Sequence, residues 1–274
     1  MVKSFVLLFL ALILFSGCSN NAQNSLEKAK LKGKVKTVIS LAITFGNTSK
    51  TSIISNNNGK TDTQFTIIPP RIDTSKTIDN YTGKGNLIEH TIFVMNRIFK
   101  SKNIYDDGNR LLIDSLYDDE KLQSYTICEY DNKNNQTGLN EFNPDGSLRL
   151  KLKYTNKYDE KGNQIENDRF NAIGKLSKRT TYKYDGQGNQ IETNVYSDDG
   201  KLLYRANTTY DSSSNCIEAI AYQPDSSNVT KTNYRYFDYD KVGNWLKQEL
   251  YMNDSLYKIV QRTIEYYPGE SPKR

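Results

Sequence analysis

The segment YDEKGNQIENDRFNAIGKLSKRTTYK occupies residues 158–183, and YDGQGNQIETNVYSDDGKLLYRANTT follows it at residues 184–209. The two segments are near-copies of one unit, so Tyr158, Tyr184 and Tyr210 recur at intervals of 26 residues. Each unit contains two turn-forming segments, separated by short runs rich in Tyr, Thr, Ile, Leu and Val. This pattern is typical of consecutive β-hairpins and not of helices.

Two types of turn alternate along the chain from Tyr81 onward. The first type includes YDEKGN at Tyr158, YDGQGN at Tyr184 and YDKVGN at Tyr239, and the second includes FNPDGSL at Phe142 and FNAIGKL at Phe170. In the first type, Asp159 is placed to accept a hydrogen bond from the backbone two residues later. Gly162 supplies the left-handed conformation that closes a short hairpin. Each turn is therefore expected to join two neighbouring antiparallel strands.

The turns predict an all-β fold, a long antiparallel β-meander of tandem hairpins with about seventeen strands. The aromatic residues that open the units should form ladders across the sheet near its edges. Strand twist of about 20° per strand forces so long a sheet to coil, curl or close. We expect an open, curled sheet and not a closed barrel, because no run has the lipid-facing apolar alternation over ~10 residues that membrane barrels show.

The N-terminal residues 1–17 predict an exported protein. Lys3 carries one positive charge, an apolar run extends from Phe5 to Phe15, and small residues at positions 16 and 17 precede Cys18. The apolar run is too short to span a bilayer as a helix, which is typical of a secretory leader. The segment also resembles the lipobox of bacterial lipoproteins, which implies that Cys18 is lipidated. An ordinary leader with an incidental cysteine is the alternative.

The composition divides the chain into five parts. These are a signal peptide at 1–17, the lipidated cysteine and a tether at 18–33, an irregular N-terminal β cap at 34–80, the tandem hairpin array at 81–267 and a flexible tail at 268–274. In Gram-negative lipoproteins a serine after the lipidated cysteine goes with sorting to the outer membrane, and Ser19 has this position. No acidic cluster follows Cys18, which favours the periplasmic face over the cell surface.

The bulk composition limits the partners. Only 36% of the residues are hydrophobic, and 20 Tyr and 10 Phe must supply much of the buried apolar area. The 37 basic and 32 acidic residues alternate along the strands and form no basic stripe, so no nucleic-acid partner is expected. Cys128 and Cys216 lie about three units apart in the meander, more than ~20 Å at ~4.8 Å per strand, so we expect no disulfide between them.

The recurring Y-D-x-x-G-N-x-I/L pattern at Tyr158, Tyr184 and Tyr239 resembles the YD (RHS-type) repeat, and the chain resembles the repeat-bearing lipoproteins of Bacteroidota. The resemblance covers residues 81–267 and implies a continuous sheet of hairpins. Large YD-repeat proteins wrap such a sheet into a shell around a toxin, and the shell ends in an Asp-rich self-cleavage motif. This chain has no such motif and is too short to enclose a cargo domain, so the resemblance implies the sheet without encapsulation.

Residues for catalysis are not found, and neither a cofactor nor a metal site is predicted. The single histidine, His90, has no nucleophile-elbow sequence to serve, and we interpret it as an exposed strand residue. One histidine and two scattered thiols make no zinc site, and the Asp-rich turns lack the spacing of a calcium loop. Trp245, Tyr184 and Tyr210 are the candidates for a ligand-stacking surface, with cross-strand packing as the alternative role for Trp245.

These observations favour a non-enzymatic, lipid-anchored envelope protein whose extended β-repeat sheet is a binding or scaffolding surface for protein or glycan. The membrane contact is expected through the lipid on Cys18. An immunity-type lipoprotein that neutralises a toxin is the first alternative. A hydrolase with an unrecognised carboxylate pair is the second.

Overall fold

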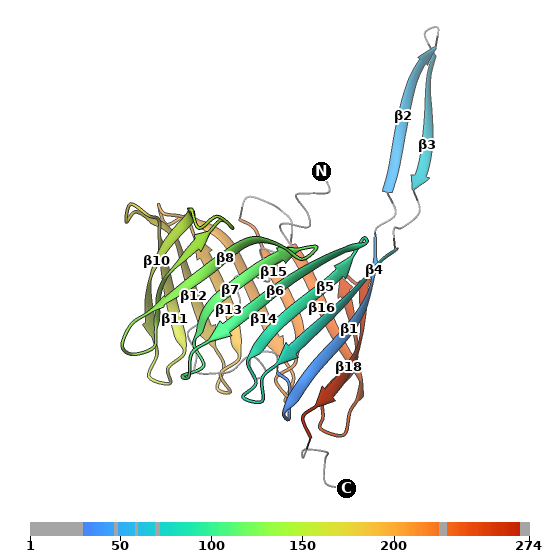
Figure 1. Ribbon diagram of the computed structural model, residues 1–274. Coiled ribbons are helices and arrows are strands. Elements are labelled where there is room, and N and C mark those ends of the chain that lie inside the picture. The colour runs from blue at the N-terminus through green and yellow to red at the C-terminus, as the bar shows by residue number, and fades with distance from the viewer. Residues whose placement is uncertain (1–29, 47–48, 58–59, 69–71, 225–228, 269–274) are drawn as a thin grey trace.

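The structure is a computed structural model of the 274-residue chain, and it describes residues 30–46, 49–57, 60–68, 72–224 and 229–268 (Figure 1). Cys18, the leader and most of the predicted tether lie outside the described residues. The described residues are strands joined by tight turns. In this part of the chain no helix has the length and apolarity needed to cross a membrane.

The strands follow one another at short intervals. The first nine are β1 (Val35–Phe45), β2 (Ser49–Asn57), β3 (Lys60–Ile68), β4 (Ile72–Tyr81), β5 (Leu87–Val94), β6 (Arg97–Tyr105), β7 (Leu111–Asp118), β8 (Lys121–Tyr130) and β9 (Gln136–Phe142). The others are β10 (Leu148–Tyr158), β11 (Gln164–Phe170), β12 (Leu176–Tyr184), β13 (Gln190–Tyr196), β14 (Leu202–Tyr210), β15 (Cys216–Tyr222), β16 (Val229–Tyr239), β17 (Trp245–Met252) and β18 (Ser255–Tyr266).

Within the described ranges, sixteen strands form one closed antiparallel barrel (Figure 1). Each strand from β4 to β18 pairs with the next in sequence, and β1 completes the ring by pairing with both β18 and β4. Strands β2 and β3 form a separate hairpin that projects from the barrel. The region 34–80 thus contributes β1 and β4 to the wall.

The antiparallel meander is as predicted, but the open, curled sheet is wrong, because the two ends of the meander meet. Closure requires only that the edge strands pair, and this pairing removes the exposed edges of a long sheet. The apolar alternation used in that expectation is a property of lipid-facing strands, and closure of the sheet does not depend on it.

The seam that closes the barrel joins segments from the two ends of the chain. Its pairing runs from Val35 opposite Tyr266 to Thr44 opposite Lys258. Beyond the last pair, the backbone N–H of Tyr267 donates to the carbonyl oxygen of Lys34 at 3.0 Å. These contacts span more than 200 residues of sequence, so no local motif announces them.

A buried apolar cluster lies at one end of this seam. Leu31, Val35, Val38 and Tyr81 form it, and the hydroxyl of Tyr267 donates to the carbonyl oxygen of Tyr81 at 2.7 Å. Burial raises the pKa of Tyr81. The cluster holds β1, β4 and the chain after β18 together where the barrel closes.

The predicted turn chemistry is confirmed at Asp159 and Gly162. The Asp159 carboxylate accepts from the backbone N–H of Lys161 at 2.9 Å and of Asn163 at 2.8 Å. The Asn163 side-chain amide donates to the other carboxylate oxygen at 2.8 Å. Gly162 has a φ of 82°, the left-handed conformation that the sequence predicts there.

Strands β8 and β15, which carry the two described thiols, lie far apart in the ring, and no disulfide joins Cys128 to Cys216. Cys128 is buried and Cys216 is half-buried. Burial raises the pKa of the Cys216 thiol to about 11, which leaves it protonated and weakly reactive at neutral pH.

Candidate functional site: the barrel lumen

Alternate side chains of each strand face the lumen, and in β10 exposure shows which ones. In β10, Leu152 is buried and Tyr154 half-buried, whereas Thr155 and Lys157 are exposed. Side chains crowd together on the concave side of a barrel and spread apart on the convex side, so Leu152 and Tyr154 face inward. A barrel of sixteen strands is too wide for its side chains to fill, and a water-accessible lumen remains.

In β1, exposure shows that the more apolar face of the strand is the outer one. Leu41 and Ile43 point outward and are 53% and 41% exposed, whereas Val38 and Ala42 on the opposite face are only 3% and 6% exposed. An apolar alternation therefore does not identify the inner face in this barrel.

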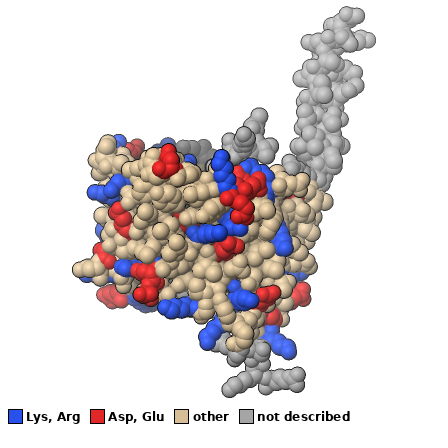
Figure 2. All heavy atoms as spheres, viewed as in Figure 1, with Lys and Arg blue, Asp and Glu red and all other residues tan. Residues whose placement is uncertain are grey.

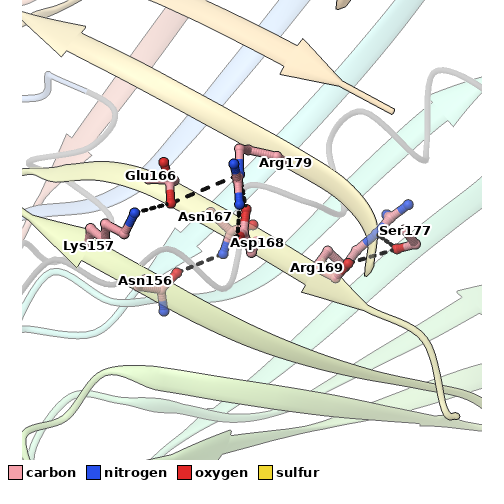
Figure 3. A network of polar contacts seen from close by, with 8 residues as sticks. All are labelled: Asn156, Lys157, Glu166, Asn167, Asp168, Arg169, Ser177 and Arg179. Atoms are coloured by element: carbon pink, nitrogen blue, oxygen red, sulfur yellow. Dashed lines mark hydrogen bonds and ion pairs between the residues drawn. The ribbon is translucent and has the colours of Figure 1, made fainter. Parts of the chain in front are cut away.

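The outer face of β10–β12 carries a ladder of ion pairs (Figure 3). Arg179 donates two hydrogen bonds to Asp168, at 2.7 and 2.8 Å, and Lys157 lies 2.7 Å from Glu166. The hydrogen bonds to Asp168 raise the pKa of Arg179. Figure 2 shows acidic and basic side chains scattered over the visible surface, most of which is formed by other residues. Each outward Lys or Arg would cost about 2–4 kcal/mol at the midplane of a bilayer, so this face is suited to water.

The tyrosines that open the units line one mouth of the barrel. Their hydroxyl groups donate to backbone carbonyl oxygens on the preceding strand: Tyr130 to Leu111 at 2.9 Å, Tyr184 to Gln164 at 2.8 Å and Tyr210 to Gln190 at 3.0 Å. The predicted aromatic ladder is therefore present, and it is held by these hydrogen bonds. Burial raises the pKa of Tyr184 and of Tyr210 to about 12.

The structure separates the three candidate stacking residues. Tyr184 and Tyr210 lie two strands apart at this mouth. Trp245 is engaged in cross-strand packing, because the Arg262 guanidinium lies 3.2 Å from the centre of the indole ring and the Tyr236 ring lies 5.5 Å away. Arg262 also donates to the carbonyl oxygen of Trp245 at 2.9 Å, and burial lowers the pKa of Arg262 to about 10. Arg262 therefore covers one face of the Trp245 indole.

Small side chains cover the inner wall of β13–β16. In one cross-strand row Thr193 is opposite Ala206, Ala206 is opposite Ala221 and Ala221 is opposite Thr230; in the next row Thr208, Ala219 and Thr232 are neighbours. All seven side chains are half-buried, as expected for residues that face an open lumen. We refer to these seven residues as the small-residue floor.

Three tyrosines border the small-residue floor from the lumen side. Tyr182 is directly opposite Thr193, Tyr204 precedes Ala206 by two residues on β14, and Tyr234 follows Thr232 by two residues on β16. Burial raises the pKa of all three hydroxyl groups, so they remain protonated donors at neutral pH. Aromatic rings around a low floor form a concave, partly apolar surface with a few polar groups, the usual character of a ligand site.

A polar cluster lies on the opposite wall, since seven strands separate β5 from β13 in either direction around the ring. His90 contacts Asp79 through Nδ1, and their side chains are only 17% and 20% exposed, so the interpretation of His90 as an exposed residue is wrong. Burial raises the pKa of nearby Asp114 to about 6, and the His90 charge opposes this shift. Within the described residues, His90 Nε2 and Asp114 Oδ1 are buried without a hydrogen-bond partner.

This polar cluster lacks the geometry of a catalytic triad. Ser101 lies directly opposite His90 on β6, but Nε2 has no partner among the described residues, so the imidazole does not activate the serine hydroxyl. No group of three or more His, Cys, Asp or Glu side chains in the described ranges is arranged to hold a metal ion.

The chain before β1 lies against the mouth that carries the tyrosines. Lys30 donates to the Asn189 side chain at 3.2 Å. Asn244, which is only 2% exposed, accepts from the backbone N–H of Lys32 at 2.7 Å and donates to its carbonyl oxygen at 2.9 Å. Asn189 and Asn244 end two different turns of the first type, so this segment joins separate hairpins along the rim.

The sequence named Tyr184 and Tyr210 as candidate stacking residues, and they lie at the mouth, outside the small-residue floor. It missed the floor and the cluster at His90. The available signal was the alternation of small residues at every second position in three successive strands. This alternation does not show whether the small residues face the lumen or the solvent outside. Closure of the barrel determines which face of each strand is the inner one.

Comparison with known proteins places only the fold. No family model matches the chain, and no curated protein matches it. The chain is similar to a porin-like protein from Bacteroides uniformis ATCC 8492, with a TM-score of 0.50 and 11% identity over 85% of this chain and 98% of that one. At this identity the similarity shows a shared barrel fold and nothing of activity.

Two weaker structural similarities have TM-scores that support no argument. One is to a mutant of the Photorhabdus luminescens Tc holotoxin pore, with a TM-score of 0.30 and 12% identity over 77% of this chain and 14% of that one. The other is to a DUF1329 family protein from Desulfovibrio piger ATCC 29098, with a TM-score of 0.24 and 9% identity over 86% and 88% of the two chains.

Proposed function

We propose that this chain is a non-enzymatic lipoprotein of the bacterial cell envelope, built from YD-like repeats, whose barrel lumen binds a glycan. The lipid on Cys18 would hold it to the outer membrane, with the barrel on the periplasmic side. The binding surface is the inner wall of the barrel, in place of the extended open sheet that the sequence favoured. A protein ligand is the competing outcome of the experiment below.

The observation that carries this proposal is the small-residue floor with Tyr182, Tyr204 and Tyr234 around it. Sugar rings present flat apolar faces and hydroxyl groups at their edges. Tyrosine rings match the faces, and their hydroxyl groups match the edges, while a floor of Ala and Thr leaves room for the ligand. The half-buried state of these side chains supports access from the lumen.

The charged side chains on the outer face support a barrel that is tethered to the membrane by the lipid and is not inserted in the bilayer. Ion pairs such as Arg179 with Asp168 and Lys183 with Glu192 lie on the outer side of the wall. A lipid-facing surface would need an apolar band about 25 Å tall in their place. Balanced pairs of this kind also give no basic surface for nucleic acid.

The repeats provide a matched test of glycan binding. Thr208 stands at the position of the next unit that is equivalent to Tyr182. The substitution Tyr182→Thr therefore introduces a residue that the equivalent hairpin of the next unit already contains. Loss of one stacking ring, worth about 0.5–1.5 kcal/mol, should weaken binding about 2- to 12-fold. Lys183→Thr, which copies Thr209 on the outer face, is the control and should leave affinity unchanged.

Binding would be measured by titrating full-length protein in detergent with the oligosaccharides that a glycan array selects. A blank array, or equal affinities for the two variants, contradicts a glycan site in the lumen. Incorporation of an alkynyl palmitate into the wild type, but not into Cys18→Ala, tests the lipid anchor separately.

A further inference from the structure

Two basic side chains face each other on the lumen side of β11 and β12. Arg169 is directly opposite Lys178, and Arg169 is also opposite the inward-facing Tyr154. The register shifts between Arg169 and Phe170, so Ser177 is an extra residue that points to the same side as Lys178. The Ser177 hydroxyl accepts from Arg169 Nε at 3.2 Å and donates to the Arg169 carbonyl oxygen at 3.0 Å (Figure 3).

No carboxylate neutralises this pair among the described residues. Arg169 forms no ion pair there. The pKa of Lys178 is lowered by burial and, to a smaller extent, by the charge of Arg169. Like charges directly opposite each other destabilise a sheet. On the outer side of the same strands, by contrast, Lys157, Arg179 and Lys183 all have acidic partners.

The neighbouring unit shows that the fold does not require these residues. Alignment of residues 158–183 with residues 184–209 places Val195, Leu203 and Tyr204 at the positions of Arg169, Ser177 and Lys178. The turn-forming Asp and Gly, the Ile-Glu pair and the outer Arg are the same in both units. The three lumen residues therefore differ between two units that keep the same turns, although other positions, such as Tyr182 and Thr208, differ as well.

We propose that Arg169, Ser177 and Lys178 form a binding site for an anionic group, a carboxylate or a phosphate, on a ligand that enters the lumen. Ser177 engages Nε of Arg169 and leaves the two terminal nitrogens for a bidentate contact, while Lys178 adds a second positive charge. The bulge places all three donors on one side of the wall. This inference rests on the proposed lumen function and narrows its ligand to an acidic glycan.

The test compares inorganic phosphate, trigalacturonate and a neutral trisaccharide as probes of the full-length protein by NMR titration. The variant Arg169→Val/Ser177→Leu/Lys178→Tyr copies the next unit and should bind phosphate and trigalacturonate at least tenfold more weakly. Arg169→Gln/Lys178→Gln removes the charges with little change in size and should give the same loss. Lys157→Thr/Lys183→Thr removes two outer charges and should change neither affinity by more than twofold.

The outcomes separate this site from the general function. Loss of phosphate binding only in the two lumen variants supports the anion site, even where no glycan binds. Equal phosphate affinity in the wild type and both lumen variants overturns it, and so does equal loss in the outer-face control. If the neutral trisaccharide binds all variants alike and phosphate binds none, the anion site is wrong while the glycan-binding lumen stands.

Discussion

The hydroxyl of Tyr210 on β14 donates to the carbonyl oxygen of Gln190 on β13 at 3.0 Å, beyond the last ladder pair of that hairpin. Tyr184 makes the same contact with Gln164 one unit earlier, at 2.8 Å. Each contact closes the open end of one hairpin where the next turn begins. The repeated tyrosines thus fasten the two strands of each hairpin together at its open end.

Tyr210→Phe should therefore lower the free energy of unfolding by about 0.5–1.5 kcal/mol, because it removes one half-buried hydrogen bond and keeps the ring. Urea unfolding measures this change. Tyr239→Phe is the control, since Tyr239 is 51% exposed and should change stability little. Equal effects of the two substitutions would mean that the hydroxyl of Tyr210 contributes nothing specific.

Alanine substitutions at two glycines in neighbouring units would distinguish the cost of backbone strain from the cost of steric contact. Gly162 has a φ of 82°, Gly186 does not have a positive φ, and a Cβ at either position meets nothing within 4 Å. Gly162→Ala should cost about 1–2 kcal/mol through strain in the left-handed region alone. Gly186→Ala should be neutral or slightly stabilising, since it only restricts the unfolded chain. Thermal unfolding of the two variants would show the difference, and a similar cost for both would disprove the strain argument.

The hairpins could be predicted from the sequence because every interaction that defines them is local. Asp159 caps its own turn, and Tyr210 reaches a backbone atom only twenty residues away. Closure could not be predicted in this way. Closure depends on the pairing of β1 with β18 and on contacts such as that between Lys32 and Asn244. The repeat period and the turn motifs do not predict contacts between residues so far apart in the sequence.

The candidate site shows the same contrast between local and distant contacts. The repeated motif predicted the row of tyrosines that contains Tyr184 and Tyr210, whereas their role in ligand stacking stays a prediction. The roles of Arg169 and His90 depend on which side of the wall is concave, and the alternating pattern alone gives two equivalent faces. In β1 the more apolar face, with Leu41 and Ile43, even points outward.

The polar cluster on the β4–β7 wall should make stability depend on pH through Asp114. Burial raises its pKa in the folded state to about 6, above the ordinary value of 3.8. The folded state therefore favours the protonated carboxyl, and this contribution is fully present below about pH 4 and lost as the pH rises through about 6. The difference in unfolding free energy between wild type and Asp114→Asn should fall by up to about 3 kcal/mol between pH 4 and pH 7.

Urea unfolding at several pH values tests this dependence, with Glu160→Gln in an exposed turn as the control. The difference for the control should stay constant with pH. A flat difference for Asp114→Asn would show that the carboxyl titrates in the folded state as it does in the unfolded chain, so that burial does not raise its pKa.

The outer face should be open to water even when the protein is attached to lipid. Thr155 is exposed on the outer side of β10 and is directly opposite Asp168. A cysteine in the variant Thr155→Cys should react with a membrane-impermeant maleimide in lipid-reconstituted protein as fast as in detergent. Cys128, which is buried, should react only after unfolding. Protection of position 155 by lipid alone would instead place the barrel wall in the bilayer.

Closure itself can be tested by a cross-link over the seam. Ala42 on β1 is directly opposite Val260 on β18, and residues opposed in this way have Cα atoms about 4.5–5.5 Å apart, within reach of a disulfide. The variant Ala42→Cys/Val260→Cys should oxidise to a 42–260 disulfide that peptide mapping identifies. It should also raise the unfolding midpoint, because it joins the two ends of the barrel.

The variant Ala42→Cys/Thr208→Cys is the matched control for this cross-link. Four strands separate β1 from β14 in the ring, roughly 24 Å at ~4.8 Å per strand, so this pair should stay reduced. In an open sheet β1 and β18 would not be neighbours. If the 42–260 disulfide does not form under oxidation, the sheet is open and the barrel is wrong.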